Sequence, residues 1–137
     1  MKNLFFFLMT AVALTFTACD HDGHDHDHDE DGAYEVTISI NEPTADQQIN
    51  VGEALHVDVT MERVDEKTIH NVLLEIRDTD GNSVMVLDEG HKHVAGMYSY
   101  HAEDWTPTEA GNYVIFAQTT NDDDEEANTK EMTITVE

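Results

Sequence analysis

Apolar and polar residues alternate along several short stretches between residues 34 and 137. In residues 34–40, Val36, Ile38 and Ile40 share one face, and residues 54–61 and 130–136 show the same period of two. This period is typical of a half-buried β-strand. Four more stretches of strand character are residues 70–78, 83–89, 97–104 and 112–120, and turn-forming residues separate the stretches at 41–46, 78–82, 88–96 and 107–112.

About seven short strands in about a hundred residues favour an all-β fold, a single antiparallel β-sandwich over residues 34–137. The stretch "PTEAGNYVIFAQTT" (107–120) resembles the approach to the penultimate strand of immunoglobulin-like and polycystic-kidney-disease-type domains. This resemblance implies an immunoglobulin-like sandwich. It also implies that Tyr113 is a tyrosine-corner residue whose hydroxyl bonds back into the preceding loop, and that Trp105 plugs the core or a loop.

Antiparallel topology predicts which loops meet. If successive strands alternate in direction, the connections 62–69, 89–96 and 121–128 and the start of the first strand all lie at one end. His70 begins its strand at that end, and the loop 89–96 carries His91 and His93. Seven of the nine histidines and the acidic run 122–126 are therefore predicted to converge there.

The N-terminus reads as an export signal. Lys2 precedes an apolar run from Leu4 to Ala13, and small residues follow, as in a secretory signal peptide over residues 1–18. The residues "FTAC" (16–19) resemble a bacterial lipobox, which implies cleavage before Cys19 and attachment of a diacylglyceryl group to its thiol. Cys19 is the only cysteine, and lipidation accounts for an unpaired thiol in an exported chain.

Residues 19–33, here called the tether, hold four histidines and seven acids after Cys19. We expect the tether to be disordered, because its charges repel one another and it has almost no apolar residues. The acids resemble the signal that sends some Gram-negative lipoproteins to the outer face of the outer membrane. An Asp directly after the cysteine marks inner-membrane retention in other bacteria. We expect a lipid-anchored protein at the outer membrane, on the cell surface, with the periplasmic face as the alternative.

The net charge is −24, which opposes binding to nucleic acid or to an anionic lipid surface and favours cations. His24, His26 and His28 are two residues apart and face one side of an extended chain, and neighbouring aspartates can accept the second ring N–H. The predicted ligands for Zn²⁺, Ni²⁺ or Cu²⁺ are His21, Asp22, His24, Asp25, His26, Asp27 and His28 in the tether, and His91 and His93 on a loop. A spacer without metal is the alternative for the tether. His56, His70 and His101 are expected to be surface or hydrogen-bonded side chains rather than ligands.

Other cation chemistry and catalysis are less favoured. The loop "NDDDEE" (121–126) is rich in the carboxylate ligands that Ca²⁺ prefers, but neither it nor the tether has the spacing of an EF-hand. We therefore interpret this loop as the solvated tip of a hairpin. No nucleophile elbow, H-E-x-x-H helix, P-loop or Rossmann fingerprint occurs, so we expect no enzyme.

Two classes of function remain. The first is an exported lipoprotein that binds or buffers a divalent transition metal through its tether, in one version beside an outer-membrane transporter. The second is a surface adhesion or assembly module in which the tether is only a stalk and the sandwich binds a protein or glycan. An exposed patch of Tyr98, Tyr100, Trp105 and Phe116 would favour the second.

Overall fold

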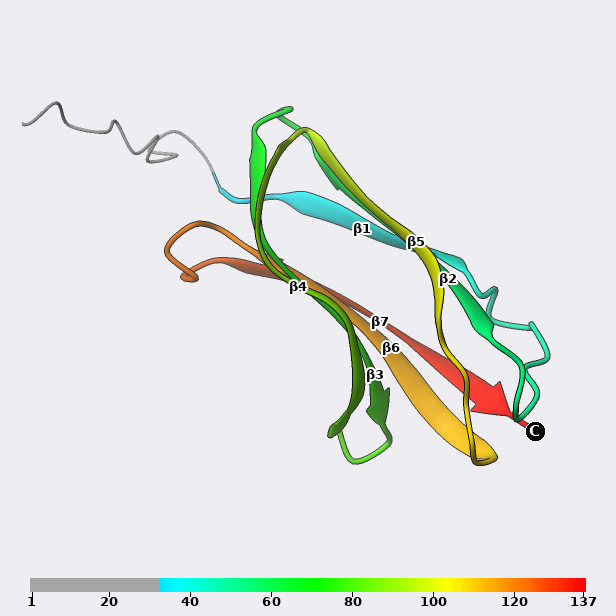
Figure 1. Ribbon diagram of the computed structural model, residues 1–137. Helices are drawn as coiled ribbons and strands as arrows, with labels where there is room; N and C mark the ends of the chain where they lie inside the picture. Colours follow the sequence, from blue (N-terminus) through cyan, green and yellow to red (C-terminus); the bar gives the residue numbers. More distant parts are fainter. Residues whose placement is uncertain (1–32) are drawn as a thin grey trace, which may run out of the picture. The chain divides into compact units, whose positions relative to one another are not determined.

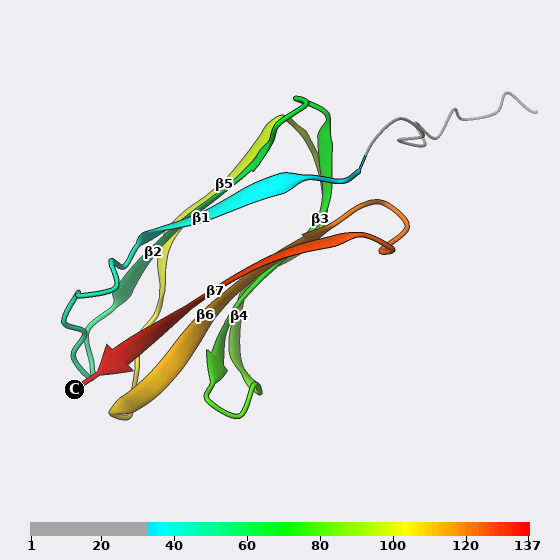
Figure 2. The same ribbon diagram turned by 180° about the vertical axis from the view of Figure 1, so that it is seen from behind.

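The computed structural model describes residues 33–137, and these form seven antiparallel strands in two sheets (Figures 1 and 2). The signal peptide, Cys19 and the tether histidines lie outside the described residues. The strands are β1 Val36–Glu42, β2 Leu55–Arg63, β3 Thr68–Asp78, β4 Ser83–Ala95, β5 Met97–Trp105, β6 Gly111–Thr120 and β7 Ala127–Val136. The prediction of an all-β sandwich of about seven strands is confirmed. Among the described residues, no helix is long and apolar enough to span a membrane.

One sheet has the strand order β1-β2-β5 and the other β4-β3-β6-β7. The segment after β1 reaches the second sheet, because Ile49 bridges Val136 and accepts a hydrogen bond from the Glu137 amide at 2.9 Å. The fourth strand hydrogen-bonds to β3 and leaves β5 at the edge of the first sheet. This arrangement brings the second half of β4 next to the start of β3, where His70 lies.

The core lies between the inner faces of the two sheets. Alternation in β2 places Val57, Val59 and Met61 inside with no exposed surface, and they face Leu74 and Ile76 of β3, which are equally buried. Burying a side chain of this size contributes about 1.5–3 kcal/mol. β6 and β7 add Ile115, Ala117, Ile134 and Val136. The period-two pattern of the sequence therefore corresponds to the pleat of each strand.

A tyrosine corner closes the end of the sandwich where β6 begins. The Tyr113 hydroxyl donates a hydrogen bond to the Glu109 carbonyl at 3.0 Å, and the Trp105 ring meets the Tyr113 ring edge-on with centroids 5.0 Å apart. Trp105 is 6% exposed. Both residues have the roles that the resemblance implied.

The opposite end is held by Arg63, whose guanidinium is buried but neutralised. Arg63 Nε lies 2.8 Å from Asp65 Oδ1, Nη1 donates to the Thr68 carbonyl at 2.8 Å, and the group covers the Tyr34 ring. The Gly96 amide donates to the Lys67 carbonyl at 2.9 Å, so the β2–β3 and β4–β5 connections meet here. The predicted convergence of these connections is confirmed.

Candidate metal centre

His91 and His93 lie on a strand and not on the predicted loop. β4 continues to Ala95, and Asn71, Val72 and Leu73 of β3 pair with residues 89–91 of this extension. The loop prediction for residues 89–96 was wrong because this part of β4 is an edge strand. An edge strand can have polar residues and a glycine such as Gly90 and still form backbone hydrogen bonds with its one neighbour, which is β3 here.

A β-bulge reshapes β4 at the histidines. Between the pairs Ile69↔Val94 and Asn71↔His91, β3 advances two residues while β4 advances three. His93 has φ of 50°, in the left-handed region that non-glycine residues seldom adopt. A bulge of this kind bends the strand and redirects side chains. Here it brings His93 beside His70, which β3 supplies.

Three imidazoles consequently meet. His70, His91 and His93 each offer one ring nitrogen within 4.8 Å of those of the other two, and we call them the histidine cluster. The ring centroids are 5.3 Å apart for His70 and His93, 5.6 Å for His91 and His93, and 5.8 Å for His70 and His91. His70 is 5% exposed, whereas His91 and His93 are exposed. His70 was expected to be a surface or hydrogen-bonded side chain rather than a ligand, and the structure instead places it among possible metal ligands.

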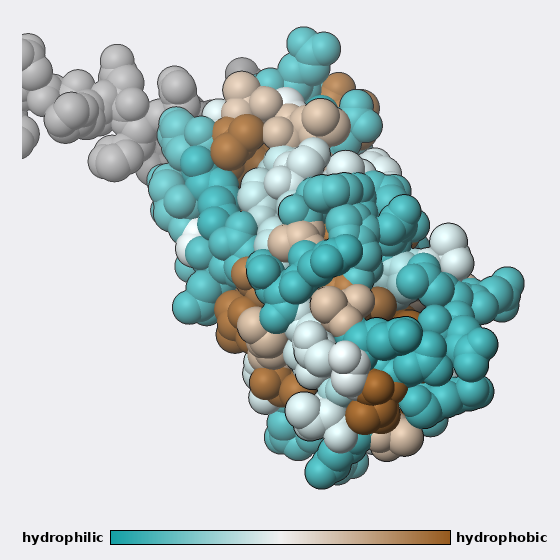
Figure 3. Space-filling model, turned by 45° about the vertical axis from the view of Figure 1, so that its right-hand side comes forward, coloured by the Kyte–Doolittle hydropathy of each residue, from teal (hydrophilic) through white to brown (hydrophobic). Residues whose placement is uncertain are grey.

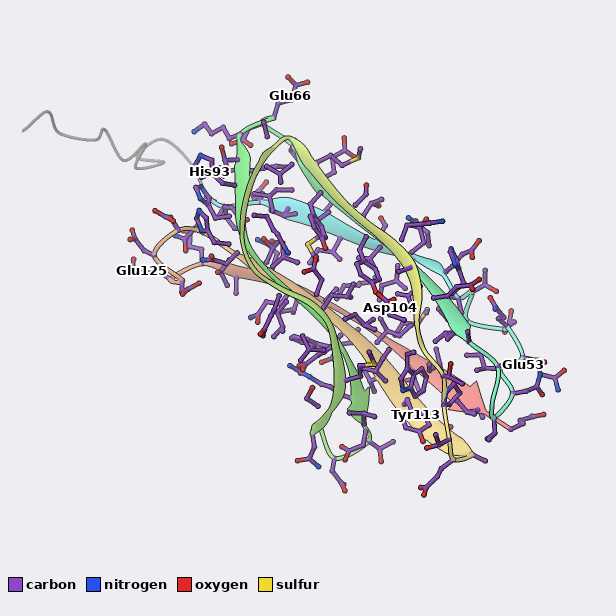
Figure 4. All side chains as sticks on the ribbon, in the orientation of Figure 1. Glu53, Glu66, His93, Asp104, Tyr113 and Glu125 are labelled. Atoms are coloured by element: carbon purple, nitrogen blue, oxygen red, sulfur yellow. The ribbon has the colours of Figure 1, made fainter. Side chains whose placement is uncertain are left out.

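An acidic side chain from the β6–β7 loop completes the cluster. Asp122 Oδ1 lies 3.7 Å from Nδ1 of His70 and 3.7 Å from Nδ1 of His91. The Asn121 side chain shapes this loop, because its Oδ1 accepts the amides of Glu125 and Glu126. Figure 4 shows His93 and Glu125 at the same end of the sandwich, with Tyr113 at the other.

Asn71 joins the loop to the cluster and orients one ring. Its Nδ2 donates to the Asn121 carbonyl at 3.1 Å and to Asp124 Oδ1 at 2.9 Å, so its Oδ1 faces His91 Nδ1 at 3.1 Å. An amide oxygen only accepts, so Nδ1 of His91 carries the proton and Nε2 keeps its lone pair. This is the arrangement by which a neighbouring acceptor prepares a histidine for metal.

The backbone at His70 is fixed as well. The Tyr34 hydroxyl accepts the His70 amide at 3.4 Å and lies 2.7 Å from Thr119 Oγ1 of β6. The Tyr34 carbonyl in turn accepts from Asn128 Nδ2 at 2.6 Å. The first described residues are thus held at the same end as the histidine cluster, as the topology predicted.

Three imidazoles and a carboxylate are a donor set for Zn²⁺, Ni²⁺ or Cu²⁺. Zn–N bonds of 2.0–2.1 Å in a tetrahedron place ligand atoms about 3.4 Å apart. The ring nitrogens, now within 4.8 Å of one another, would therefore move closer by up to about 1.4 Å. The exposed His91 and His93 rings can make this movement by rotation.

The acidic loop itself is occupied by internal hydrogen bonds. Asp124, which has φ of 57°, accepts from Thr120 Oγ1 and from Asn71, so its carboxylate holds the hairpin tip. This arrangement fits the predicted solvated tip. No described contact tests Ca²⁺ binding.

The proposed aromatic patch is absent from the described surface. Tyr98, Trp105 and Phe116 are 8%, 6% and 7% exposed, and Tyr100 is partly buried against the core. Arg77 covers the Phe116 ring at 3.3 Å from its centroid. Figure 3 shows one face of the molecule, largely hydrophilic with small separate apolar areas. The adhesion interpretation therefore loses the residues on which it depended.

No protein-family model and no curated protein matches the chain. Among solved structures, it is similar to fibronectin(III)-like modules of CbhA from Clostridium thermocellum, with 20% identity over 76% of this chain and a TM-score of 0.47. The chain spans 47% of the length of that structure. It is also similar to a CARDB domain from Pyrococcus furiosus in complex with di-metal ions, with 16% identity, 82% of this chain, 99% of that chain and a TM-score of 0.48.

A β-glucosidase from Listeria innocua in complex with glucose has a similar region, with 17% identity over 75% of this chain, 16% of that chain and a TM-score of 0.46. At these identities the similarity concerns the sandwich fold alone. The comparisons carry nothing about the chemistry of the histidines.

Proposed function

We propose that this chain is an exported, lipid-anchored protein whose β-sandwich binds one divalent transition-metal ion at the histidine cluster. The proposal rests on one observation: His70, His91 and His93 each have a ring nitrogen within 4.8 Å of those of the other two. The site lies in the β-sandwich, at the end where Tyr34 contacts the start of β3. Cys19 serves as the lipid anchor in this proposal, and the outer membrane remains its expected location.

The surroundings support a neutral-imidazole site for a cation. Asp122 supplies negative charge 3.7 Å from two of the rings, and the net charge of −24 raises the local concentration of cations. Nitrogen donors then favour Zn²⁺, Ni²⁺ and Cu²⁺ over the hard ions Mg²⁺ and Ca²⁺. With these donors, the histidine cluster would bind or buffer the metal ion. The tether histidines form a second, separate set of donors in the same proposal.

Calorimetric titration of Zn²⁺ and Ni²⁺ into the purified mature protein tests the two donor sets. One variant carries Asn in place of His21, His24, His26 and His28. A second carries His91→Ala and His93→Ala. His91 and His93 are exposed, so the fold is expected to persist in the second variant.

If the sandwich binds the metal, the first variant keeps a site of micromolar or tighter affinity and the second loses it. If the tether alone binds the metal, the result is reversed and the proposal for the sandwich is wrong. Circular dichroism of both variants checks that the strands remain.

A further inference from the structure

A second pair of histidines lies on the outer face of the other sheet. Alternation in β2 points His56 away from the core, and the register Asp58↔His101 brings β5 alongside it. The His56 and His101 rings meet edge-on at 77°, with centroids 4.3 Å apart. This separation is shorter than any in the histidine cluster. We call these residues the outer histidine pair.

Asp58 prepares His101 for a metal ion. Asp58 Oδ2 lies 3.0 Å from His101 Nδ1, and Asp58 Oδ1 accepts from Asn41 Nδ2 at 2.8 Å. A carboxylate oxygen accepts hydrogen bonds and does not donate them. Nδ1 of His101 therefore carries the proton, and Nε2 presents its lone pair.

Two more carboxylates flank the other ring. Glu42 Oε2 lies 3.6 Å from His56 Nε2, and Glu103 Oε1 lies 3.8 Å from His56 Nδ1. These separations are close to the spacing of about 3.4 Å that neighbouring ligands of a tetrahedral Zn²⁺ ion have. An oxygen ligand is thus present on either side of His56, one from β1 and one from β5. The Glu42 and Glu103 side chains are 54% and 66% exposed, so either can rotate toward an ion held by His56 and His101. Among the described residues, three donor atoms already lie within 4.8 Å of one another only in the histidine cluster.

The donors come from three adjacent strands of a hydrogen-bonded sheet, which holds their backbones in place. The His56 and His101 side chains are 26% and 67% exposed, so an ion in solution can reach both rings. Neither ring fills the core, and the hydrogen bond that His101 Nδ1 donates to Asp58 is the one that a histidine ligand ordinarily makes through its second nitrogen.

We propose that His56 and His101 bind a second transition-metal ion, with Glu42 or Glu103 as an oxygen ligand. The site is independent of the histidine cluster, which β3 and β4 of the other sheet supply. It has two imidazoles where the cluster has three, so it binds Zn²⁺ more weakly and suits Cu²⁺, which accepts mixed nitrogen and oxygen ligands in a square plane.

Electron paramagnetic resonance of bound Cu²⁺ tests the pair, because nitrogen hyperfine structure reports how many imidazoles are coordinated. The starting protein is the full mature chain with the tether histidines replaced by Asn and with His91→Ala and His93→Ala. One Cu²⁺ ion per chain with two coordinated nitrogens is the expected result. Adding His56→Ala and His101→Ala abolishes this signal, whereas Ser99→Ala on the same face of β5 leaves it unchanged.

The Asp58→Ala substitution gives a further readout. Loss of the acceptor for His101 weakens Cu²⁺ binding by about 10–100-fold without removing a ligand. The proposal is overturned if the starting protein binds no Cu²⁺, or if its signal survives loss of both histidines. Because His91 and His93 are absent throughout, failure of this test is separate from failure of the histidine cluster.

Discussion

Replacement of His93 by glycine should make the metal-free protein more stable than replacement by alanine. His93 has φ of 50°, and the left-handed conformation costs a residue with a Cβ about 1–2 kcal/mol. Alanine keeps this cost. Glycine avoids it but loses more backbone entropy on folding, which costs about 0.5–1 kcal/mol.

Both variants lack the ring, so its contacts cancel in the comparison. The difference leaves glycine more stable than alanine by about 0.5–1 kcal/mol in the free energy of unfolding. At about 4–8 °C per kcal/mol for a domain of this size, the melting temperature should differ by about 2–8 °C. Urea denaturation in the presence of a chelator measures the free-energy difference.

His91 supplies the matched control. It is exposed on the same strand and is not among the positive-φ residues of the described chain. Here His91→Gly should be less stable than His91→Ala by about 0.5–1 kcal/mol. If the glycine variant at position 93 is no more stable than the alanine variant, the bulge does not strain the backbone and the reasoning fails. At a hundred times the dissociation constant of the histidine cluster, the wild-type chain should gain about 2.7 kcal/mol from that site. The His93 and His91 variants each lack one of its ligands and should gain less.

Three further outcomes are expected. Tyr113→Phe removes the hydrogen bond to the Glu109 carbonyl and should lower the free energy of unfolding by about 1 kcal/mol, measured by urea denaturation. Hydrogen bonds from the side chain and backbone of Asn82 lower the pKa of Asp78 below its ordinary value of 3.8. This stabilisation is therefore complete above pH 3.8 and is lost as the pH falls through the lowered pKa of the folded state. The stability advantage of the wild type over Asp78→Ala should therefore shrink in acid denaturation series below pH 3.8, and an unchanged advantage would contradict the assignment. Zn²⁺ affinity should fall from pH 7 to pH 5 in calorimetric titrations because protonated imidazole has no lone pair for a metal, and persistence at pH 5 would indicate carboxylate ligands instead.

The strands with a buried face were predictable because burial imposes alternation. Val57, Val59 and Met61 have no exposed surface, and the sequence marks each of them with a polar neighbour on either side. The tyrosine corner was predictable for a different reason, since Gly111 and Tyr113 form a local motif. Both features depend on residues close together in the chain.

The second half of β4 was not predictable in the same way. At the sheet edge, its polar residues and Gly90 give the composition of a loop. The alternation of His91 and His93 with Lys92 was visible, but the extra residue of the bulge was not, because only pairing with β3 defines it.

His70 was missed as a ligand candidate because its role depends on tertiary register. The topology placed it at the correct end, but its neighbours Ile69 and Asn71 give no sign of a metal site. Proximity to His93 requires the bulge, and proximity to Asp122 requires the β6–β7 loop to fold over the start of β3. A search for histidines on neighbouring strands at one end would have included it.

The high negative charge and the histidines have separate consequences. Thirty acidic residues attract every cation, and screening at physiological salt reduces this attraction beyond about 8 Å. Charge alone therefore gives no preference for Zn²⁺ over the far more abundant hard ions. A preference requires imidazole nitrogens that converge, and in the described residues strand register brings together the three rings of the histidine cluster and the two rings of the outer histidine pair. In our proposals, selectivity therefore depends on the register of the two sheets, and this is the reason for which they place the metal ligands of the described residues on strands and not in the acidic loop.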